Sequence, residues 1–137
     1  MFTGIVENTG IVTHITTAGT NYTFSIESPL AAALKVDQSL SHNGVCLTVE
    51  AIENQQHRVT AIAETLSKTS LSAWKVGSII NLERCVAMNG RLDGHMVQGH
   101  VDCTATCIEV IAKDGSWEYS FIFAGEFASF IIEKGSV

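Results

Sequence analysis

The sequence predicts an all-β fold, in which a small antiparallel barrel is followed by a partial second copy of the same barrel. Short segments rich in Val, Ile, Thr and aromatic residues alternate with turn-forming residues. The chain also repeats itself, because Met1 to Glu7 matches Met96 to Asp102 at a shift of 95 and Tyr22 matches Tyr119 at a shift of 97. About six strands with only brief helical insertions favour a closed or nearly closed antiparallel barrel over a parallel sheet with crossover helices.

Alternation of apolar and polar residues locates the strands. They are expected at Ile5 to Ile15, Tyr22 to Glu27, Val45 to Ile52, Arg58 to Ile62 and Ile79 to Glu83. Turns are expected at Thr17 to Asn21, at Asn54 to Gln56 and at Asn43-Gly44, a pair that supplies the positive φ values of a tight reversal. Pro29 before the alanine-rich Leu30 to Leu34 predicts one or two helical turns, with Glu126 to Ile132 as the counterpart in the second copy.

The repeat sets the expected domain organisation. Residues 1–88 form the first barrel, residues 89–94 a linker and residues 95–137 an incomplete second barrel. The linker contains two glycines and has no apolar periodicity. A first copy of 95 residues leaves 42 of the 137 for the second, so the sequence is expected to be a fragment that stops within that copy.

Composition narrows the function classes. Hydrophobic residues make up 46% of the chain, which suffices for a core. A net charge of −6 with only eight Lys and Arg argues against a nucleic-acid surface, so small molecules are the expected partners. The apolar runs are too short to span a bilayer, and Met1-Phe2-Thr3 lacks the basic start of a signal peptide, so a cytoplasmic location is expected.

The cysteines are expected to be free thiols, since nothing else suggests secretion; they are Cys46, Cys85, Cys103 and Cys107. Cys103 and Cys107 stand near two histidines, as metal ligands often do. On a strand, however, positions four apart lie ~13 Å from each other, too far for one ion. The spacing therefore predicts no metal site.

Two of the five histidines are candidates for function. His95 and His100 are flanked by glycines, where an imidazole has little packing role. His14, His42 and His57 are expected to be surface or hydrogen-bonded structural residues.

Cys46 and Glu64-Thr65 have structural interpretations as well as functional ones. Between Val45 and Leu47, Cys46 would by default be a buried, inert thiol. Glu64-Thr65 could be a strand end followed by a helix cap, with Thr65 capping Lys68 to Leu71.

Four motifs together resemble the riboflavin synthase family of the bacterial trimeric type, which is built from lumazine-binding barrels. They are Met1 to Glu7, Asn43 to Val49, Glu64 to Leu66 and Gly94 to Asp102. The resemblance covers the whole chain and implies two six-stranded Greek-key barrels, with a C-terminal helix that joins three subunits into a homotrimer. It also implies that a complete site lies between the first barrel of one subunit and the second barrel of its neighbour.

The resemblance further implies a reaction, the last step of riboflavin biosynthesis. Two molecules of 6,7-dimethyl-8-ribityllumazine dismutate to riboflavin and 5-amino-6-(D-ribitylamino)uracil, without metal or redox cofactor. The alternative is a non-catalytic lumazine- or flavin-binding protein of the same fold. The enzyme is favoured because the chain keeps the Gly94 to Val101 pattern with its histidine. As a fragment, the chain is expected to bind the lumazine or riboflavin and to turn over slowly or not at all.

Site residues follow from the resemblance motif by motif. The family's pattern assigns catalytic positions to His100, Ser39 and Cys46. The implied substrate-binding residues are Gly4, Ile5, Val6, Cys46, Leu47, Thr48, Thr60, Ala61, Ile62, Ala63, Glu64, Thr65, Gly99, His100, Val101 and Lys134.

Overall fold

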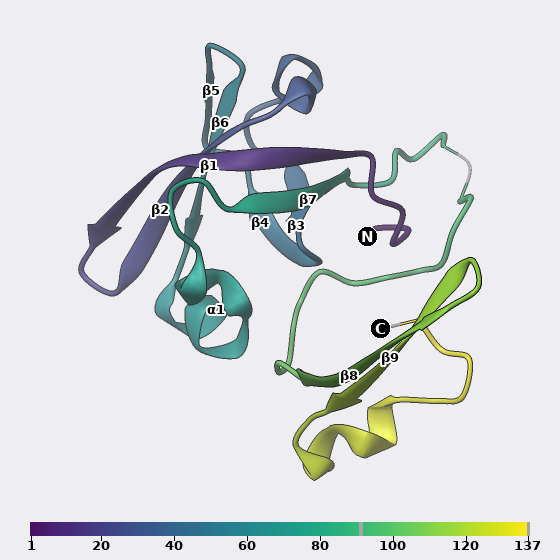
Figure 1. Ribbon diagram of the computed structural model, residues 1–137. Helices are drawn as coiled ribbons and strands as arrows, with labels where there is room; N and C mark the ends of the chain where they lie inside the picture. The colour runs from purple at the N-terminus through teal and green to yellow at the C-terminus, as the bar shows by residue number, and fades with distance from the viewer. Residues whose placement is uncertain (91, 137) are drawn as a thin grey trace.

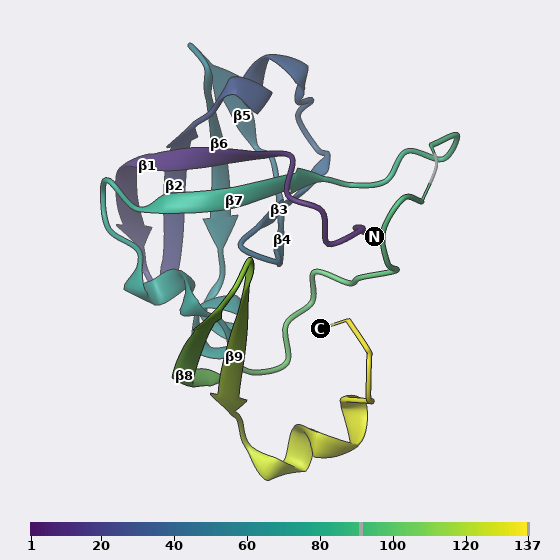
Figure 2. The ribbon, with the colours of Figure 1, turned by 45° about the vertical axis from the view of Figure 1, so that its right-hand side comes forward.

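The computed structural model describes residues 1–90 and 92–136. Seven strands form one antiparallel sheet in the order β4-β3-β7-β1-β2-β6-β5. Their bounds are β1 Asn8–Ala18, β2 Asn21–Glu27, β3 Ser39–His42, β4 Val45–Thr48, β5 Ala51–Glu53, β6 Gln56–Ala61 and β7 Ile79–Arg84. The sheet curls until β4 contacts β6, so the two ends of the strand order approach each other (Figures 1 and 2). The predicted all-β antiparallel fold is confirmed.

The sheet has two strands more than the five located from the sequence, because β3 was not located and one predicted strand is broken in two. The Val49 N–H donates to the Gln38 carbonyl, whereas the Glu50 N–H donates to the Arg58 carbonyl. Between Val49 and Glu50 the backbone therefore stops pairing beside β3, the partner of β4, and starts pairing with β6. Alternation along Val45 to Ile52 gives no sign of this corner, because both halves are extended.

The first strand also differs from its prediction. It begins at Asn8 rather than Ile5 and continues to Ala18. The Glu7 N–H still donates to the Leu82 carbonyl of β7, and further back Gly4, with φ +79°, turns the chain. The predicted reversal at Asn43-Gly44 is confirmed, with φ values of 49° and 88°. Positive φ at Asn54 and Gln55 confirms the next predicted turn.

The helical segments are short. A 3-10 helix η1, Pro29–Ala33, begins with proline as predicted, and η3, Gly125–Phe130, occupies the second predicted position. Between β6 and β7 lie α1, Ala63–Lys68, and η2, Ser70–Ala73. None of the helices in the described part of the chain is long and apolar enough to cross a membrane.

The core lies inside the curled sheet. Phe24 and Ile26 of β2, Val12 of β1 and Ile80 of β7 are fully buried, and Leu71 of η2 closes one end of this cluster. Trp74 packs edge-on against Phe24, with 5.1 Å between ring centroids. Burial of one such large apolar side chain contributes roughly 1.5–3 kcal/mol, so the core holds the short strands together.

A separate hairpin follows the barrel. It consists of β8, Thr106–Lys113, and β9, Ser116–Ile122. Its register shifts between Cys107 and Glu109, just as that of β1 and β2 shifts between Val12 and His14, 95 residues earlier. The offset of 95 between the two copies therefore holds through the whole hairpin. The change to an offset of 97 comes after β9, whereas the sequence comparison places it before Tyr22. The division at residues 89–94 and the second barrel stay predictions.

Two predicted structural histidines meet inside the barrel. His42 of β3 and His57 of β6 are buried, and their Nε2 atoms lie 2.9 Å apart. His42 Nδ1 lies 3.0 Å from the Leu40 carbonyl oxygen, which can only accept, so His42 Nδ1 carries a proton and His57 Nε2 donates to His42 Nε2. Burial lowers the pKa of His42 to about 3, helped by the neighbouring ring, and burial lowers the pKa of His57 to about 4. Both rings are therefore neutral at pH 7. His14 is exposed.

We expect the buried pair to make the protein acid-sensitive. Below the ordinary histidine pKa of 6.5 the unfolded chain takes up protons that the folded chain does not, so the free energy of unfolding falls as pH drops from 6.5 towards 4. The loss should reach about 2 kcal/mol per histidine near pH 5. Urea unfolding between pH 5 and 7.5 measures it. His57→Gln should roughly halve the slope and His14→Gln should leave it unchanged, whereas a flat profile would contradict the assigned neutral pair.

Candidate functional site

The residues predicted to bind or react gather in part around one cavity of about 250 Å³, which we call the His100 pocket. Strand β4, helix α1 and the extended segment after Gln98 form its walls. Its lining is Val45, Cys46, Glu64, Thr65, Lys68, Thr69, Gly99, His100, Val101 and Asp102. His100 is exposed, while Cys46 is half-buried. An imidazole and a thiol thus face one cavity, where either group can exchange a proton with a bound molecule.

One backbone hydrogen bond, made by the residue before His100, holds this part of the chain beside β4. The Cys46 N–H donates to the Gly99 carbonyl over 2.8 Å. Glycine is required at position 99, because a Cβ there would overlap Cys46 and lie 2.9 Å from Cε2 of the Phe2 ring. The close approach of the two backbones therefore fixes where the chain emerges into His100.

Helix α1 forms the opposite wall. Glu64 and Lys68 are four residues apart on it and form an ion pair of 3.0 Å. The helix begins at Ala63, so Thr65 lies inside its first turn and the predicted cap at Thr65 is wrong. The cap belongs to Thr69, whose hydroxyl accepts from the Leu71 N–H and donates to the Thr65 carbonyl. Glu64 and Thr65 are left facing the cavity.

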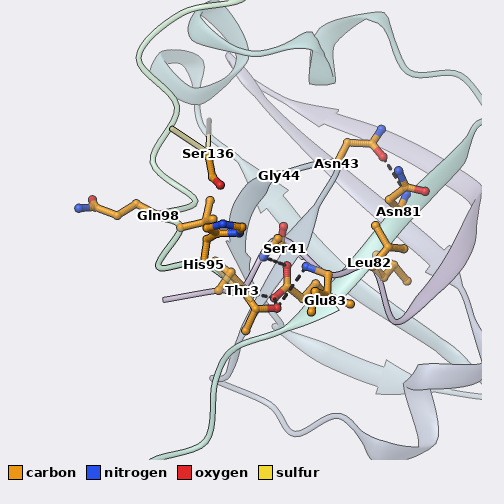
Figure 3. A pocket seen from close by; sticks show the side chains of 15 residues that line it. Thr3, Ser41, Asn43, Gly44, Asn81, Leu82, Glu83, His95, Gln98 and Ser136 are labelled. Atoms are coloured by element: carbon orange, nitrogen blue, oxygen red, sulfur yellow. Dashed lines mark hydrogen bonds between the residues drawn. The ribbon is translucent and has the colours of Figure 1, made fainter. Parts of the chain in front are cut away.

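A second and larger cavity, of about 430 Å³, takes the other predicted residues; we call it the Glu83 pocket (Figure 3). Gly4, Ile5 and Val6 line it, together with His95. Its polar lining includes Ser41, Asn43, Asn81 and Glu83, which the sequence did not single out. The structure therefore distributes the predicted binding residues over two pockets instead of one.

Several predicted residues line neither pocket. Ser39 pairs with Thr48 across β3 and β4, so this predicted catalytic residue is not brought together with His100. Leu47 and Ala61 belong to the hydrophobic core and line neither pocket. The Thr60 hydroxyl lies 2.9 Å from that of Thr23 and donates to Glu50. The other predicted residues outside both cavities are Thr48, Ile62, Ala63 and Lys134.

Alternation on a strand explains why Leu47 does not line the pocket that its neighbour Cys46 lines. Motif matching selects consecutive residues, such as Cys46-Leu47-Thr48, yet consecutive side chains of a strand point to opposite faces. Lys68 is a pocket residue that the sequence could have indicated, because it stands four positions after Glu64 on a helix. The four cysteines are free, as predicted. Within residues 1–90 and 92–136, no group of His, Cys, Asp and Glu is arranged to hold a metal ion.

The closed antiparallel sheet with a polar cavity beside it defines a small barrel of the ligand-binding kind. The family model for the lumazine binding domain matches residues 3–85. The chain belongs to the lumazine binding domain family, and the relatives it resembles in sequence are riboflavin synthases. The family-level resemblance of the four motifs is thereby confirmed.

Three relatives describe this similarity. Riboflavin synthase of Bacillus amyloliquefaciens is 37% identical over the whole chain, which spans 64% of that protein's length. Riboflavin synthase of Mycobacterium tuberculosis is 39% identical, and the chain spans 69% of its length. The crystal structure of LumP complexed with riboflavin has a TM-score of 0.86 at 21% identity, covering 96% of this chain and 72% of that one, which shows a shared fold.

The close packing of Gly99 against Cys46 and Phe2 leads to a prediction. Gly99→Ala should lower the free energy of unfolding by about 1–3 kcal/mol, because neither the Cys46 backbone nor the Phe2 ring can move away freely. Urea unfolding measures this loss, and amide hydrogen exchange at Cys46 should speed up. Gly125→Ala is the matched control, since a Cβ there meets nothing within 4 Å. Equal stability of the two variants would show that Gly99 is not tightly packed.

Proposed function

We propose that the protein acts as a riboflavin synthase, converting two molecules of 6,7-dimethyl-8-ribityllumazine into riboflavin and 5-amino-6-(D-ribitylamino)uracil. The observation that carries the proposal is the His100 pocket, where His100, Cys46 and Glu64 meet on a fold of the lumazine-binding kind. Sequence similarity to riboflavin synthases at 33–39% identity over the whole chain supports the enzyme. A structure of LumP complexed with the same lumazine, at a TM-score of 0.82, supports the ligand class.

The size of the pocket bears on how the reaction is arranged. Ligand pockets commonly measure about 300–1,000 Å³, so a cavity of about 250 Å³ lies below this range and leaves no room for two lumazines. The dismutation needs two, because one molecule gives a four-carbon unit to the other. A second binding surface must therefore face the first, and we propose that a neighbouring copy supplies it within a homotrimer. Holding both rings in place makes the encounter effectively intramolecular.

Within the pocket we assign proton transfer to His100. His100 is exposed, and imidazole is the side chain that serves most often in general acid–base catalysis. The pyrimidine-fused ring of the lumazine acts as its own electron sink, so the reaction calls for a base and for positioning. Cys46 and Thr65 serve as contacts that hold the ring and the ribityl chain.

The proposal extends to organisation and location. The connection from β2 to β3 passes β1 and β7 in the strand order, as in a Greek key. The shared hairpin geometry supports a first barrel at residues 1–88, a linker at 89–94 and a second copy from residue 95. Four free cysteines favour a reducing compartment, so we propose a cytoplasmic location.

Titration of the 137-residue chain with dimethylribityllumazine, followed by ligand fluorescence, tests binding. Saturation at one ligand per chain is expected from the size of the His100 pocket. The same mixtures, assayed for riboflavin over time, test the reaction. If the chain neither binds lumazine nor forms riboflavin, the proposed function is contradicted. Lumazine binding with slow or absent turnover is the expected result, because the chain spans 64% of the length of the riboflavin synthase it matches.

His100→Ala separates chemistry from binding. We expect riboflavin formation to fall about a hundredfold or more, because general acid–base catalysis contributes at least that much, while lumazine affinity changes by less than about threefold. His14→Ala is the matched control, as an exposed histidine on β1 that lines neither pocket. Equal losses in turnover and affinity would assign His100 to binding alone.

A further inference from the structure

Glu83 is buried although it lies on the outer face of its strand. Along β7, Ile80 and Leu82 point into the core, whereas Ile79 and Asn81, on the same face as Glu83, are exposed. Glu83 is only 8% exposed because the N-terminal segment lies over it. A carboxylate taken out of water in this way is costly unless donors satisfy it.

The donors all come from the N-terminal segment. The carboxylate accepts from the Thr3 N–H and the Thr3 hydroxyl, the latter over 2.7 Å, and from the Gly4 N–H over 3.1 Å (Figure 3). Two successive N–H groups can point at one anion because Gly4 has φ +79°. Residues 3 and 4 are therefore fastened to the end of β7 by charge-assisted hydrogen bonds.

The fastened segment in turn holds the chain that carries both candidate histidines. Phe2 and Val97 exchange two backbone hydrogen bonds of 2.9 and 3.0 Å. The His95 N–H donates to the Thr3 carbonyl over 2.9 Å. Gly94 lies against Thr3 so closely that a Cβ would be 2.5 Å from its carbonyl oxygen. Residues 94–97 are thus laid along residues 2–3.

Beyond Val97 the same segment reaches β4 through Gly99 and then enters the His100 pocket. Its backbone hydrogen bonds run to the N-terminal segment on one side and to Cys46 on the other, and Val101 packs against the core. Only the first of these contacts depends on a buried charge.

We propose that Glu83 is a positioning residue for the His100 pocket: by holding residues 3 and 4 it fixes residues 94–99, and with them the place of His100. This inference rests on the proposed function, since it concerns how the same site is assembled. Glu83 does not line the His100 pocket and acts through the chain it anchors.

Glu83→Gln tests the anchor with little change in size. The amide offers one accepting oxygen, so its NH₂ group must face either the Gly4 N–H or the Thr3 donors, and one N–H loses its partner. We expect hydrogen exchange of the Phe2, His95 and Val97 amides to speed up at least about tenfold relative to Phe24 in β2. Lumazine affinity, measured by fluorescence titration of the 137-residue chain, should weaken by about tenfold, because Gly99 and Val101 line the pocket beside His100 and would shift with the segment.

Ile80→Val is the matched control, because it weakens the core on the same strand without touching the anchor. It should leave the exchange of Val97 relative to Phe24 unchanged. If Glu83→Gln fails to fold, Thr3→Val removes the hydroxyl that donates to Glu83 and accepts from the Ile5 N–H, keeps the Thr3 N–H donor, and should give a smaller loss of the same kind.

The outcomes separate this inference from the proposed function. Unchanged exchange at Val97 in Glu83→Gln overturns the anchor, and faster exchange with unchanged lumazine affinity overturns its positioning role. Absence of lumazine binding by the unsubstituted chain contradicts the proposed function instead, and exchange at Val97 then decides the anchor by itself.

Discussion

Closure of the sheet at Val49 and Glu50 is the constraint on which the rest of the structure depends. At that corner the backbone exchanges a partner near β3 for one on β6, so the strands enclose Phe24, Ile26 and the other core residues. The corner also brings His42 and His57 within hydrogen-bonding distance. Without it, β4 and β6 would lie at opposite ends of a flat sheet and the core would be open to water.

The candidate site is built outside this closed sheet from segments with little regular structure. Residues 2–4 and 94–101 are joined by one isolated bridge and by the hydrogen bond from His95 to Thr3, and they depend on β4 and β7 for support. Their positions are set by glycines that allow close approach and by one buried carboxylate. A rigid barrel that presents reactive groups on attached loops is a common arrangement for binding sites.

The structure stabilises its buried polar groups in two different ways. His42 and His57 are kept neutral because burial lowers the pKa of each, and one hydrogen bond joins the two rings. Glu83 instead receives three hydrogen bonds from residues 3 and 4. The first arrangement joins β3 to β6 inside the barrel, and the second fastens the N-terminal segment to its outside.

The sequence by itself determined the fold class, the turn at Asn43-Gly44 and the family, because alternation, turn residues and motifs are local properties that survive in a linear chain. It also brought His100, Cys46 and Glu64 forward as site residues. Only the tertiary structure decided that Leu47 and Ala61 belong to the core, that Ser39 stands apart from His100, and that Gly4 to Val6 line a different cavity. The reason is that side-chain direction on a strand and hydrogen bonds between residues some eighty positions apart, such as those of Glu83 with Thr3, depend on how the sheet curls.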